Sequence, residues 1–451
     1  MKTNIAKKFL GNTSWLIAQN IYSMLLSLVI GSLTARYLGP SNYGVLGYGA
    51  SLITLFVSIS KLGLDSVILN ELIVQPEKKG DYLGAALVMR LIASIFSVIG
   101  ISLLVFCIEP GNGLLLKVTF FQSLAIVFQV HETFNYWFQT ELKSKYYVIS
   151  SIIALTITGV WRIYLLYSNA SVEWFALSTS IQALVIFGIA MIMFRKLAKL
   201  KLNIHLTDIK YLLSRSYHFI IANLSIAIYM QIDKIMLGKF MGEKAVGIYS
   251  AAMTIALLWV FIPNAIINSA LPLIISERGK NYKGYIKRLQ FLIFTIATIG
   301  FLAGISILVF GKLAVSILYG SAYMQSINTL YILIWSTSLA ILGTSLSVWI
   351  VAEGLNAYQK YMALIGAAVN VVFNLIAIPK MGVSGAALAT FCSQFVVQFI
   401  APLLFKQTRP MIKILLGSFL IVNRDNLNLV KNLWYSMIKK DIKSFSGEKL
   451  N

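Results

Sequence analysis

Several ionisable side chains interrupt the long apolar stretches of this sequence, where a charge is costly and therefore usually functional. Arg90 lies seven residues into the stretch that begins at Leu83, about 10 Å deep at 1.5 Å per helical residue. Its planar guanidinium can bind two oxygens of a diphosphate at once, whereas a snorkelling arginine would only reach the interface. Lys234, Arg36 and Asp233 are the other candidate residues for binding a charged cargo.

His131 and Glu132 are the candidate residues for coupling to an ion. They lie in the second half of the apolar stretch 118–138, where a histidine beside a carboxylate could exchange protons at physiological pH. The alternative is a polar contact that holds two helices together. Coupling would use H+ or Na+ and requires no other cofactor. The three histidines show no metal-ligand spacing, and no nucleotide-binding or catalytic motif is present.

Three further polar residues in the apolar stretches have structural interpretations. Asn370 and Asn374 are four residues apart, so they share one face of a helix. We expect them to hydrogen-bond to neighbouring helices, with the lining of a cavity as the alternative. Arg162 is flanked by aromatic residues near the end of its stretch, which is typical of an arginine that snorkels to the interface.

The elements that carry these residues are predicted to be membrane-spanning helices. The chain has 451 residues, of which 58% are hydrophobic and 12% charged, and its mean hydropathy is +0.79. A soluble protein would carry about twice that charged fraction, so the sequence predicts an all-α integral membrane protein. Stretches of about 20 apolar residues predict twelve spans, at 14–33, 44–60, 83–108, 118–138, 148–167, 175–194, 217–237, 247–271, 289–310, 327–351, 362–378 and 383–405.

The distribution of Lys and Arg predicts the orientation. The loops and tails on the side of both termini hold 29 of the 38 basic residues, and the opposite loops hold 6. Because basic loops stay in the cytoplasm, we expect a multi-pass membrane protein with both termini cytoplasmic. The same residues explain most of the net charge of +22 by facing anionic membrane lipids, so no nucleic acid partner is expected.

The sequence contains two similar copies of one predicted turn. "RYLGPSNYGV" (36–45) and "KFMGEKAVGI" (239–248) align at an offset of 203 residues. The offset superposes three pairs: Gly39 on Gly242, Gly44 on Gly247, and Arg36 on Lys239. Each copy joins the first two spans of a six-span half, and the glycines permit a tight turn and a hinge.

The position of the two copies predicts parallel repeats, as in several transporter folds. We expect two six-helix lobes, 1–200 and 201–410, around a central cleft, and two such lobes can rock in alternating access. The alternative is that duplication only built a larger bundle. The remainder, 411–451, is predicted to be a short interfacial segment, 411–422, followed by a basic amphipathic tail on the inner membrane surface.

The stretches that carry the repeat also resemble a known family. "QIDKIMLGKFMGEKAVGIYSAAM" (231–253), the segment 352–390 with "GAALAT", "ARYLGPSNYGVLGY" (35–48) and "NYWFQTELKSKYY" (135–147) are together similar to the O-antigen (Wzx-type) polysaccharide-export flippases. These belong to the multidrug/oligosaccharidyl-lipid/polysaccharide exporter superfamily, and the resemblance covers nearly the whole chain.

The resemblance implies a flippase that moves an undecaprenyl-diphosphate-linked oligosaccharide from the cytoplasmic to the outer leaflet. The product would be O-antigen for lipopolysaccharide, capsule or exopolysaccharide, and glycosyltransferases or a polymerase of the same pathway would be its partners. The sequence leaves the sugar of the repeat unit open.

Two other functions are alternatives. A cation-coupled multidrug exporter of the same superfamily would need an acid in the cleft, and the span 14–33 has none. A membrane polysaccharide polymerase usually has substantial outer loops, whereas the longest outer loop here, 311–326, shows no acid/base pair. No enzymatic activity is therefore expected.

Overall fold

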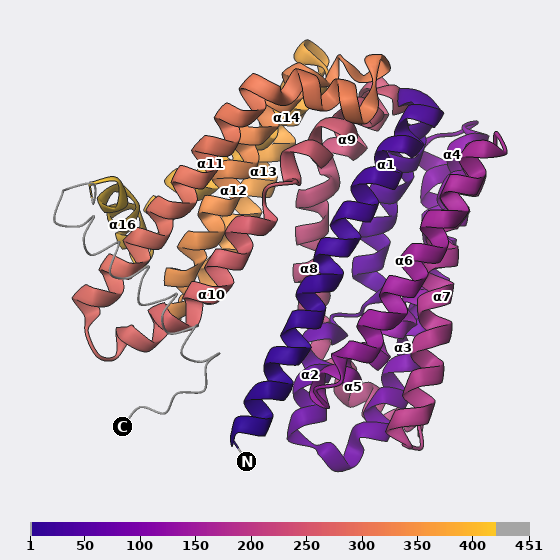
Figure 1. The fold of residues 1–451 in the computed structure, drawn as a ribbon, viewed down its shortest axis with the longest axis vertical. Helices are drawn as coiled ribbons and strands as arrows, with labels where there is room; N and C mark the ends of the chain where they lie inside the picture. Colours follow the sequence, from indigo (N-terminus) through magenta and orange to yellow (C-terminus); the bar gives the residue numbers. More distant parts are fainter. Residues whose placement is uncertain (1, 421–451) are drawn as a thin grey trace. The chain divides into compact units, whose positions relative to one another are not determined.

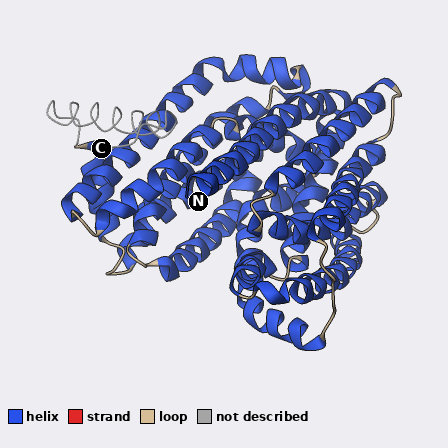
Figure 2. Cartoon of the chain, turned by 60° about the horizontal axis from the view of Figure 1, so that its bottom comes forward, coloured by secondary structure: helices blue, strands red, loops and turns tan. Residues whose placement is uncertain are grey.

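The chain is helical throughout its described part. The computed structural model describes residues 2–420, without the side chains of residues 2–13 and 66. Helices hold most of these residues, and no strand occurs among them (Figure 2). The predicted all-α fold is confirmed. The basic tail predicted after residue 422 lies outside the described residues.

Figure 1 follows the helices along the chain. The α-helices of the described part are α1 (Lys2–Ser60), α2 (Leu64–Val74), α3 (Lys79–Ile108), α4 (Gly113–Phe128), α5 (Glu132–Thr140), α6 (Ser144–Tyr167), α7 (Val172–Ala198), α8 (Leu206–Met241), α9 (Glu243–Leu257), α10 (Phe261–Arg278), α11 (Tyr282–Tyr319), α12 (Ser326–Ala352), α13 (Asn356–Met381), α14 (Val383–Phe395), α15 (Ala401–Leu404) and α16 (Pro410–Phe419). Short 3-10 turns occur at η1 (Pro76–Lys78), η2 (Gln129–His131) and η3 (Ser321–Tyr323), and a π-helical turn at η4 (Val396–Ile400).

Ten helical segments of the described part are long and apolar enough to cross a membrane, or eleven with the bent pair α9 and α10. The predicted spans 14–33 and 44–60 both lie inside α1, which is interrupted at Gly39. Counting the two arms of α1 separately, with α9 and α10 as one span, gives the twelve spans that the sequence predicts. Helix α16 has 10 residues, so it is too short to cross, as expected for this stretch.

The bend between α9 and α10 has a local cause. The two helices meet at 45°, and Pro263 lies in the first turn of α10. Proline has no N–H to donate to the carbonyl four residues earlier, which belongs to Trp259, and its ring crowds that carbonyl. The helix therefore breaks at Trp259 and restarts at Phe261.

The described residues form two compact units, and the lobe boundaries 1–200 and 201–410 stay a prediction. Among the described residues, unit 1 contains residues 2–255, 310–330 and 370–390, and unit 2 contains residues 256–309, 331–369 and 391–420. Unit 1 therefore combines elements of both predicted lobes. It contains every candidate site residue of the sequence.

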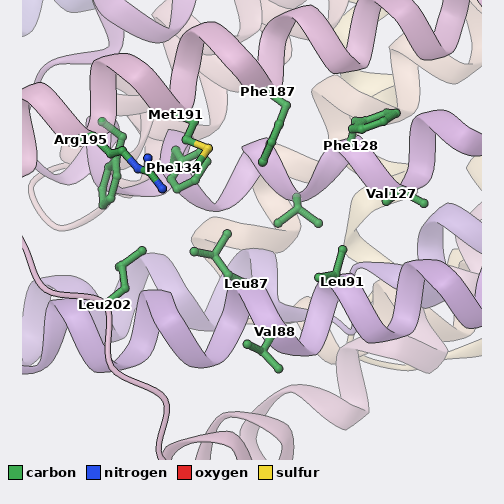
Figure 3. A pocket seen from close by; sticks show the side chains of 12 residues that line it. Leu87, Val88, Leu91, Val127, Phe128, Phe134, Phe187, Met191, Arg195 and Leu202 are labelled. Atoms are coloured by element: carbon green, nitrogen blue, oxygen red, sulfur yellow. The ribbon is translucent and has the colours of Figure 1, made fainter.

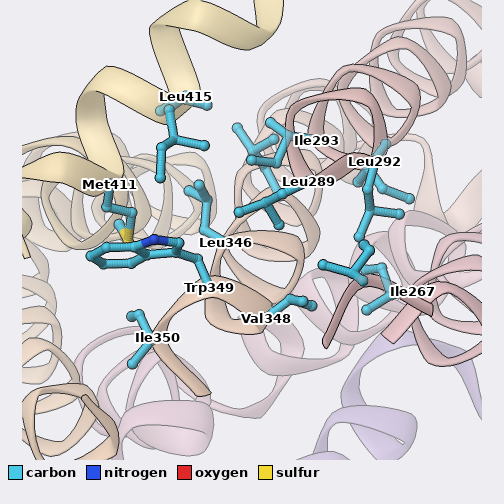
Figure 4. Close-up of a cluster of buried hydrophobic side chains, with 14 of the residues drawn as sticks. Ile267, Leu289, Leu292, Ile293, Leu346, Val348, Trp349, Ile350, Met411 and Leu415 are labelled. Carbon is cyan, nitrogen blue, oxygen red and sulfur yellow. The ribbon is translucent and has the colours of Figure 1, made fainter. Parts of the chain in front are cut away.

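Each unit has its own apolar core. In unit 1, the rings of Phe134 and Trp137 of α5 pack on Phe194 of α7, with centroids 4.8 Å and 5.3 Å apart. This contact fixes α5 and the polar residues beside it. In unit 2, Met411 and Leu415 of α16 lie over a buried core that includes Trp349 of α12 (Figure 4). The short helix α16 is thus packed on the bundle.

Candidate functional site

The motifs that carry the family resemblance converge on one carboxylate in unit 1. Asp233 comes from α8, Tyr249 from α9, Asn374 from α13 and Thr390 from α14. Tyr249 Oη donates to Asp233 Oδ2 at 2.8 Å, and Thr390 Oγ1 donates to the same oxygen at 2.5 Å. Asn374 Nδ2 donates to Asp233 Oδ1 at 2.6 Å and to Asn370 Oδ1 at 2.9 Å. The predicted interhelical hydrogen bond of Asn374 is confirmed.

This cluster is a buried set of oxygen atoms with an unsatisfied acceptor. Asp233 is 5% exposed and Asn374 is fully buried. Within the described residues, the Asp233 carboxylate has no ion-pair partner and Asn374 Oδ1 has no hydrogen-bond donor. Lys234 interacts with this carboxylate only beyond ion-pair distance, and a buried carboxylate without a close counter-charge is costly. The arrangement would therefore favour a proton or a small hard cation, which prefers oxygen ligands.

Arg90 lies in a different cluster, an ionic network between α2, α3 and α5. Its side chain is 4% exposed and forms ion pairs with Asp65 and, at 3.4 Å, with Glu132. Lys61 Nζ lies 3.0 Å from Glu132 and 3.7 Å from Asp65. Tyr136 donates to Asp65 Oδ1 at 2.5 Å, and its ring centroid lies 5.4 Å from the Arg90 guanidinium. Two cations and two carboxylates thus neutralise one another.

The network bears on two predictions from the sequence. Arg90 as a ligand for a diphosphate stays a prediction, but a diphosphate would have to compete with two carboxylates for it. His131 and Glu132 as an ion-coupling pair also stay a prediction. Glu132 already has two cationic partners, and buried His131 places Nδ1 3.0 Å from Tyr147 Oη.

Two other cations inside the spans have no ion pair within 4.0 Å among the described residues, although Lys234 interacts electrostatically with the neighbouring Asp233. Arg162 of α6 has a buried Nε without a hydrogen-bond partner, and it interacts electrostatically with Tyr43 of α1. The Tyr43 ring lies 6.4 Å from that of Tyr319 of α11. The interpretation of Arg162 as an interface anchor stays a prediction. Lys234 of α8 is half-buried, and within the described residues it has no hydrogen bond and no ion pair within 4.0 Å.

The two copies of the duplicated turn have the same backbone conformation. Gly39 has φ 69° and ψ 171°, and Gly242 has φ 79° and ψ 177°, a region that favours glycine. Gly44 and Gly247 lie one turn into the helical segments that follow, where backbone from the other copy approaches closely. The role of these four glycines as a hinge stays a prediction.

Arg36 contacts the backbone of another helix. Its Nε donates to the carbonyl of Leu318 at 3.0 Å, and Nη2 donates to the carbonyls of Ser316, at 2.9 Å, and of Ile317. These carbonyls belong to the last turn of α11. In this structure Arg36 therefore caps a helix C-terminus, and its predicted contact with a charged cargo stays a prediction.

Figure 3 shows a recess of about 360 Å³ in unit 1, between α3 and α7. Leu87 and Leu91 of α3 lie on one side, and Phe187 and Met191 of α7 lie on the other. Among the described residues that line it, Arg195 alone is charged. Such a recess suits a hydrocarbon chain, because it offers few polar groups to an oligosaccharide.

A bundle of apolar spans with a duplicated turn and ionisable groups buried within it is typical of transporter folds. The chain belongs to the polysaccharide biosynthesis protein family, whose model matches residues 9–277. The resemblance stated from the sequence is thereby confirmed at the level of the family.

Two curated relatives are similar to this chain. "Probable flippase AglR" of Haloferax volcanii is 30% identical over 186 residues, which are 40% of this chain and 38% of that protein. "Capsular polysaccharide biosynthesis protein CapF" of Staphylococcus aureus is 24% identical over 404 residues, which are 85% of this chain and 96% of that protein.

Two solved structures share the fold. The lipid II flippase MurJ in an inward closed conformation has a TM-score of 0.70 at 15% identity, with 91% of each chain covered. An inward-facing multidrug resistance MATE family transporter of the MOP superfamily has a TM-score of 0.67 at 15% identity, with 88% of this chain and 96% of that chain covered. The chain therefore has the two-lobed helical fold of this superfamily, as predicted.

Proposed function

We propose that this protein flips an undecaprenyl-diphosphate-linked oligosaccharide from the cytoplasmic to the outer leaflet of a bacterial plasma membrane. The cargo would then supply the assembly of O-antigen, capsule or exopolysaccharide. A flippase breaks no covalent bond. It lowers the free-energy barrier for moving a polar headgroup through the hydrocarbon core of the membrane. The proposal includes the predicted orientation, with both termini in the cytoplasm.

The observation that carries this proposal is the pair of cations Arg162 and Lys234, which have no ion pair within 4.0 Å among the described residues. A cation inside a membrane normally faces a counter-charge or a water-filled cavity. Arg90 has its counter-charges within the protein, whereas Arg162 faces no acidic group among the described residues and Lys234 interacts with Asp233 only beyond ion-pair distance. A diphosphate headgroup would supply the missing negative charge, and an arginine can bind two of its oxygens.

The relatives support the same class of cargo. The printed names describe one relative as a probable flippase, another as a capsular polysaccharide biosynthesis protein, and a structural neighbour as a lipid II flippase. Two of these names describe a flippase, and one describes the biosynthesis of a polysaccharide. Glycosyltransferases and a polymerase that make and consume the cargo would be the partners of this protein in its pathway.

Asp233 is the residue that we propose for coupling to H+ or Na+. It is a buried carboxylate without an ion-pair partner, and Asn370, Asn374, Thr390 and Tyr249 place further oxygen atoms around it. Glu132 is less suited to release and rebind an ion because two cations already neutralise it. The geometry thus favours Asp233 over the pair His131 and Glu132.

The same carboxylate would also serve a cation-coupled multidrug exporter, which is the second candidate function. Arg162 and Lys234 distinguish the two functions, because these cations would repel a cationic drug and attract a diphosphate. Raised tolerance to cationic dyes on expression, without any change in surface polysaccharide, would favour the exporter.

The proposal is tested in a strain that lacks its own flippase and makes a matched lipid-linked repeat unit. Surface polysaccharide is measured per amount of membrane-inserted protein. Arg162→Gln and Lys234→Gln should each reduce it, and the double variant should abolish it. Lys312→Gln removes an exposed lysine of α11 and should have no effect. Normal polysaccharide with the double variant would contradict the proposed headgroup site.

A further inference from the structure

The two copies of the duplicated turn contact each other through their backbones in unit 1. A Cβ added to Gly44 would lie 1.7 Å from the carbonyl oxygen of Glu243, and one added to Gly247 would lie 2.0 Å from that of Pro40. The offset of 203 residues relates Gly44 to Gly247 and Pro40 to Glu243. The two contacts are therefore equivalent: each glycine meets the residue that follows the first glycine of the other copy. The joint between the turns therefore has local two-fold symmetry.

Gly47 and Ser250 lie at the centre of this joint. The same offset pairs them with each other, so a two-fold axis must pass between them. An ideal Cβ on Gly47 would lie 3.0 Å from Ser250 Oγ and 3.9 Å from Ser250 Cβ. Two helical segments thus cross here with small residues on both sides.

The basic residue of each turn caps a helix in a reciprocal way. Arg36 donates to the last carbonyls of α11. Lys239, its counterpart by the offset, donates from Nζ to the carbonyl of Ile108, the last residue of α3, at 2.7 Å. Helices α3 and α11 contain the third predicted span of each half. Each turn therefore binds the third span of the other half.

These contacts can separate at a modest cost in free energy. The last carbonyls of a helix have no partner within it and carry partial negative charge, so they attract a cation. Both cations are exposed, and 51% of the Lys239 side chain is accessible to solvent. Water can therefore hydrogen-bond to the carbonyls when the cations leave. At the centre of the joint, the side chains nearest to a Cβ added to Gly47 are the small ones of Ser250 and Val246. The Arg90 network, by contrast, is a buried set of ion pairs.

We propose that this joint is the outer gate of the transporter, and that Arg36 and Lys239 are the positioning residues that hold it closed. The inference rests on the proposed function and on the predicted orientation, which places both turns on the outer side. Opening towards the outside would separate Gly44 from Gly247 and release both caps. Closing would restore them.

A reversible disulfide tests the gate directly. The distance of 3.9 Å between the added Cβ of Gly47 and the Cβ of Ser250 lies within the roughly 3.5–4.5 Å that a disulfide needs. Gly47→Cys and Ser250→Cys are combined in a chain whose native Cys107 and Cys392 are replaced by alanine. Flipping of a polyprenyl-diphosphate oligosaccharide in proteoliposomes is then measured before and after reduction.

We expect the oxidised double-cysteine protein to lose flipping and the reduced protein to recover it, while the two single-cysteine proteins respond to neither treatment. Full flipping by the cross-linked protein would overturn the gate, although the proposed function would stand. Absence of flipping by the wild-type protein would instead contradict the proposed function.

The roles of Arg36 and Lys239 are tested separately. This test uses the chain without its native cysteines and with the single substitution Ser250→Cys. Lys239→Gln should increase the labelling of Ser250→Cys by an impermeant thiol reagent by about tenfold, for one charge-assisted hydrogen bond. Arg36→Gln should increase it at least as much, because Arg36 donates to three carbonyls. Arg36→Lys should restore slow labelling, because Lys239 shows that an ammonium can fill this role. Lys244→Gln, an exposed lysine near the same turn, is the matched control. Equal labelling of all variants would refute the proposal that Arg36 and Lys239 hold the gate closed.

Discussion

Arg90 provides the sharpest test of the ionic network. Arg90→Met keeps an apolar chain of similar length and leaves Lys61 alone against Asp65 and Glu132. Removal of one partner from a buried ion pair costs about 3–5 kcal/mol. The Asp65 and Glu132 side chains are 34% and 21% exposed, so water would partly solvate the charges left behind. We therefore expect a loss of about 2–3 kcal/mol.

The assay is thermal unfolding of the purified protein in detergent, with the amount in the membrane as a second readout. Arg90→Met should unfold at a lower temperature than the wild type. Adding Asp65→Asn leaves one cation and one carboxylate, Lys61 and Glu132, and should recover at least half of the loss. Arg195→Met removes an exposed arginine of α7 and should leave unfolding unchanged.

One result would refute this reasoning. If Arg90→Met unfolds at the wild-type temperature but no longer supports polysaccharide export, then Arg90 acts on the cargo and the network does not stabilise the fold. That outcome would restore the interpretation of Arg90 as a diphosphate ligand.

Three further predictions concern other parts of the chain. Asp233→Asn keeps the size of the side chain and removes its charge, so flipping should no longer respond to an imposed Na+ or H+ gradient; an unchanged response would exclude Asp233 from coupling. Gly44→Ala places a Cβ 1.7 Å from a carbonyl oxygen, so it should destabilise the protein by about 1–3 kcal/mol, whereas Gly31→Ala, with no atom within 4 Å, should be tolerated. Topology reporters fused at Leu200 and Ser171 should report the cytoplasm and the outside respectively, and an external Leu200 would break the predicted orientation.

Much of the fold could be predicted because the membrane imposes a simple rule on the sequence. Each span must bond its own backbone groups and needs about 20 apolar residues, and those stretches are visible by composition. The turn at Gly39 was detectable because its sequence recurs at Gly242. The interruption at η2 was missed, since "FQVHE" remains compatible with a continuous helix.

The candidate site was harder to predict because its partners are distant in sequence. Asn370 and Asn374 were correctly placed on one helix face, but nothing local links them to Asp233, which lies 141 residues before Asn374. Likewise, no acid occurs three or four residues from either Arg90 or Arg162. Only the packing of α2 and α5 gives Arg90 its counter-charges and leaves Arg162 without them.

The most direct test of the central proposal is flipping by the purified protein in liposomes. A fluorescent polyprenyl-diphosphate oligosaccharide is incorporated, and the fraction accessible to an added lectin or glycosidase is followed over time. We predict protein-dependent equilibration across the bilayer, which Arg162→Gln combined with Lys234→Gln abolishes while the protein remains folded. If vesicles with the wild-type protein equilibrate no faster than empty vesicles under any imposed ion gradient, the protein is not the flippase that we propose.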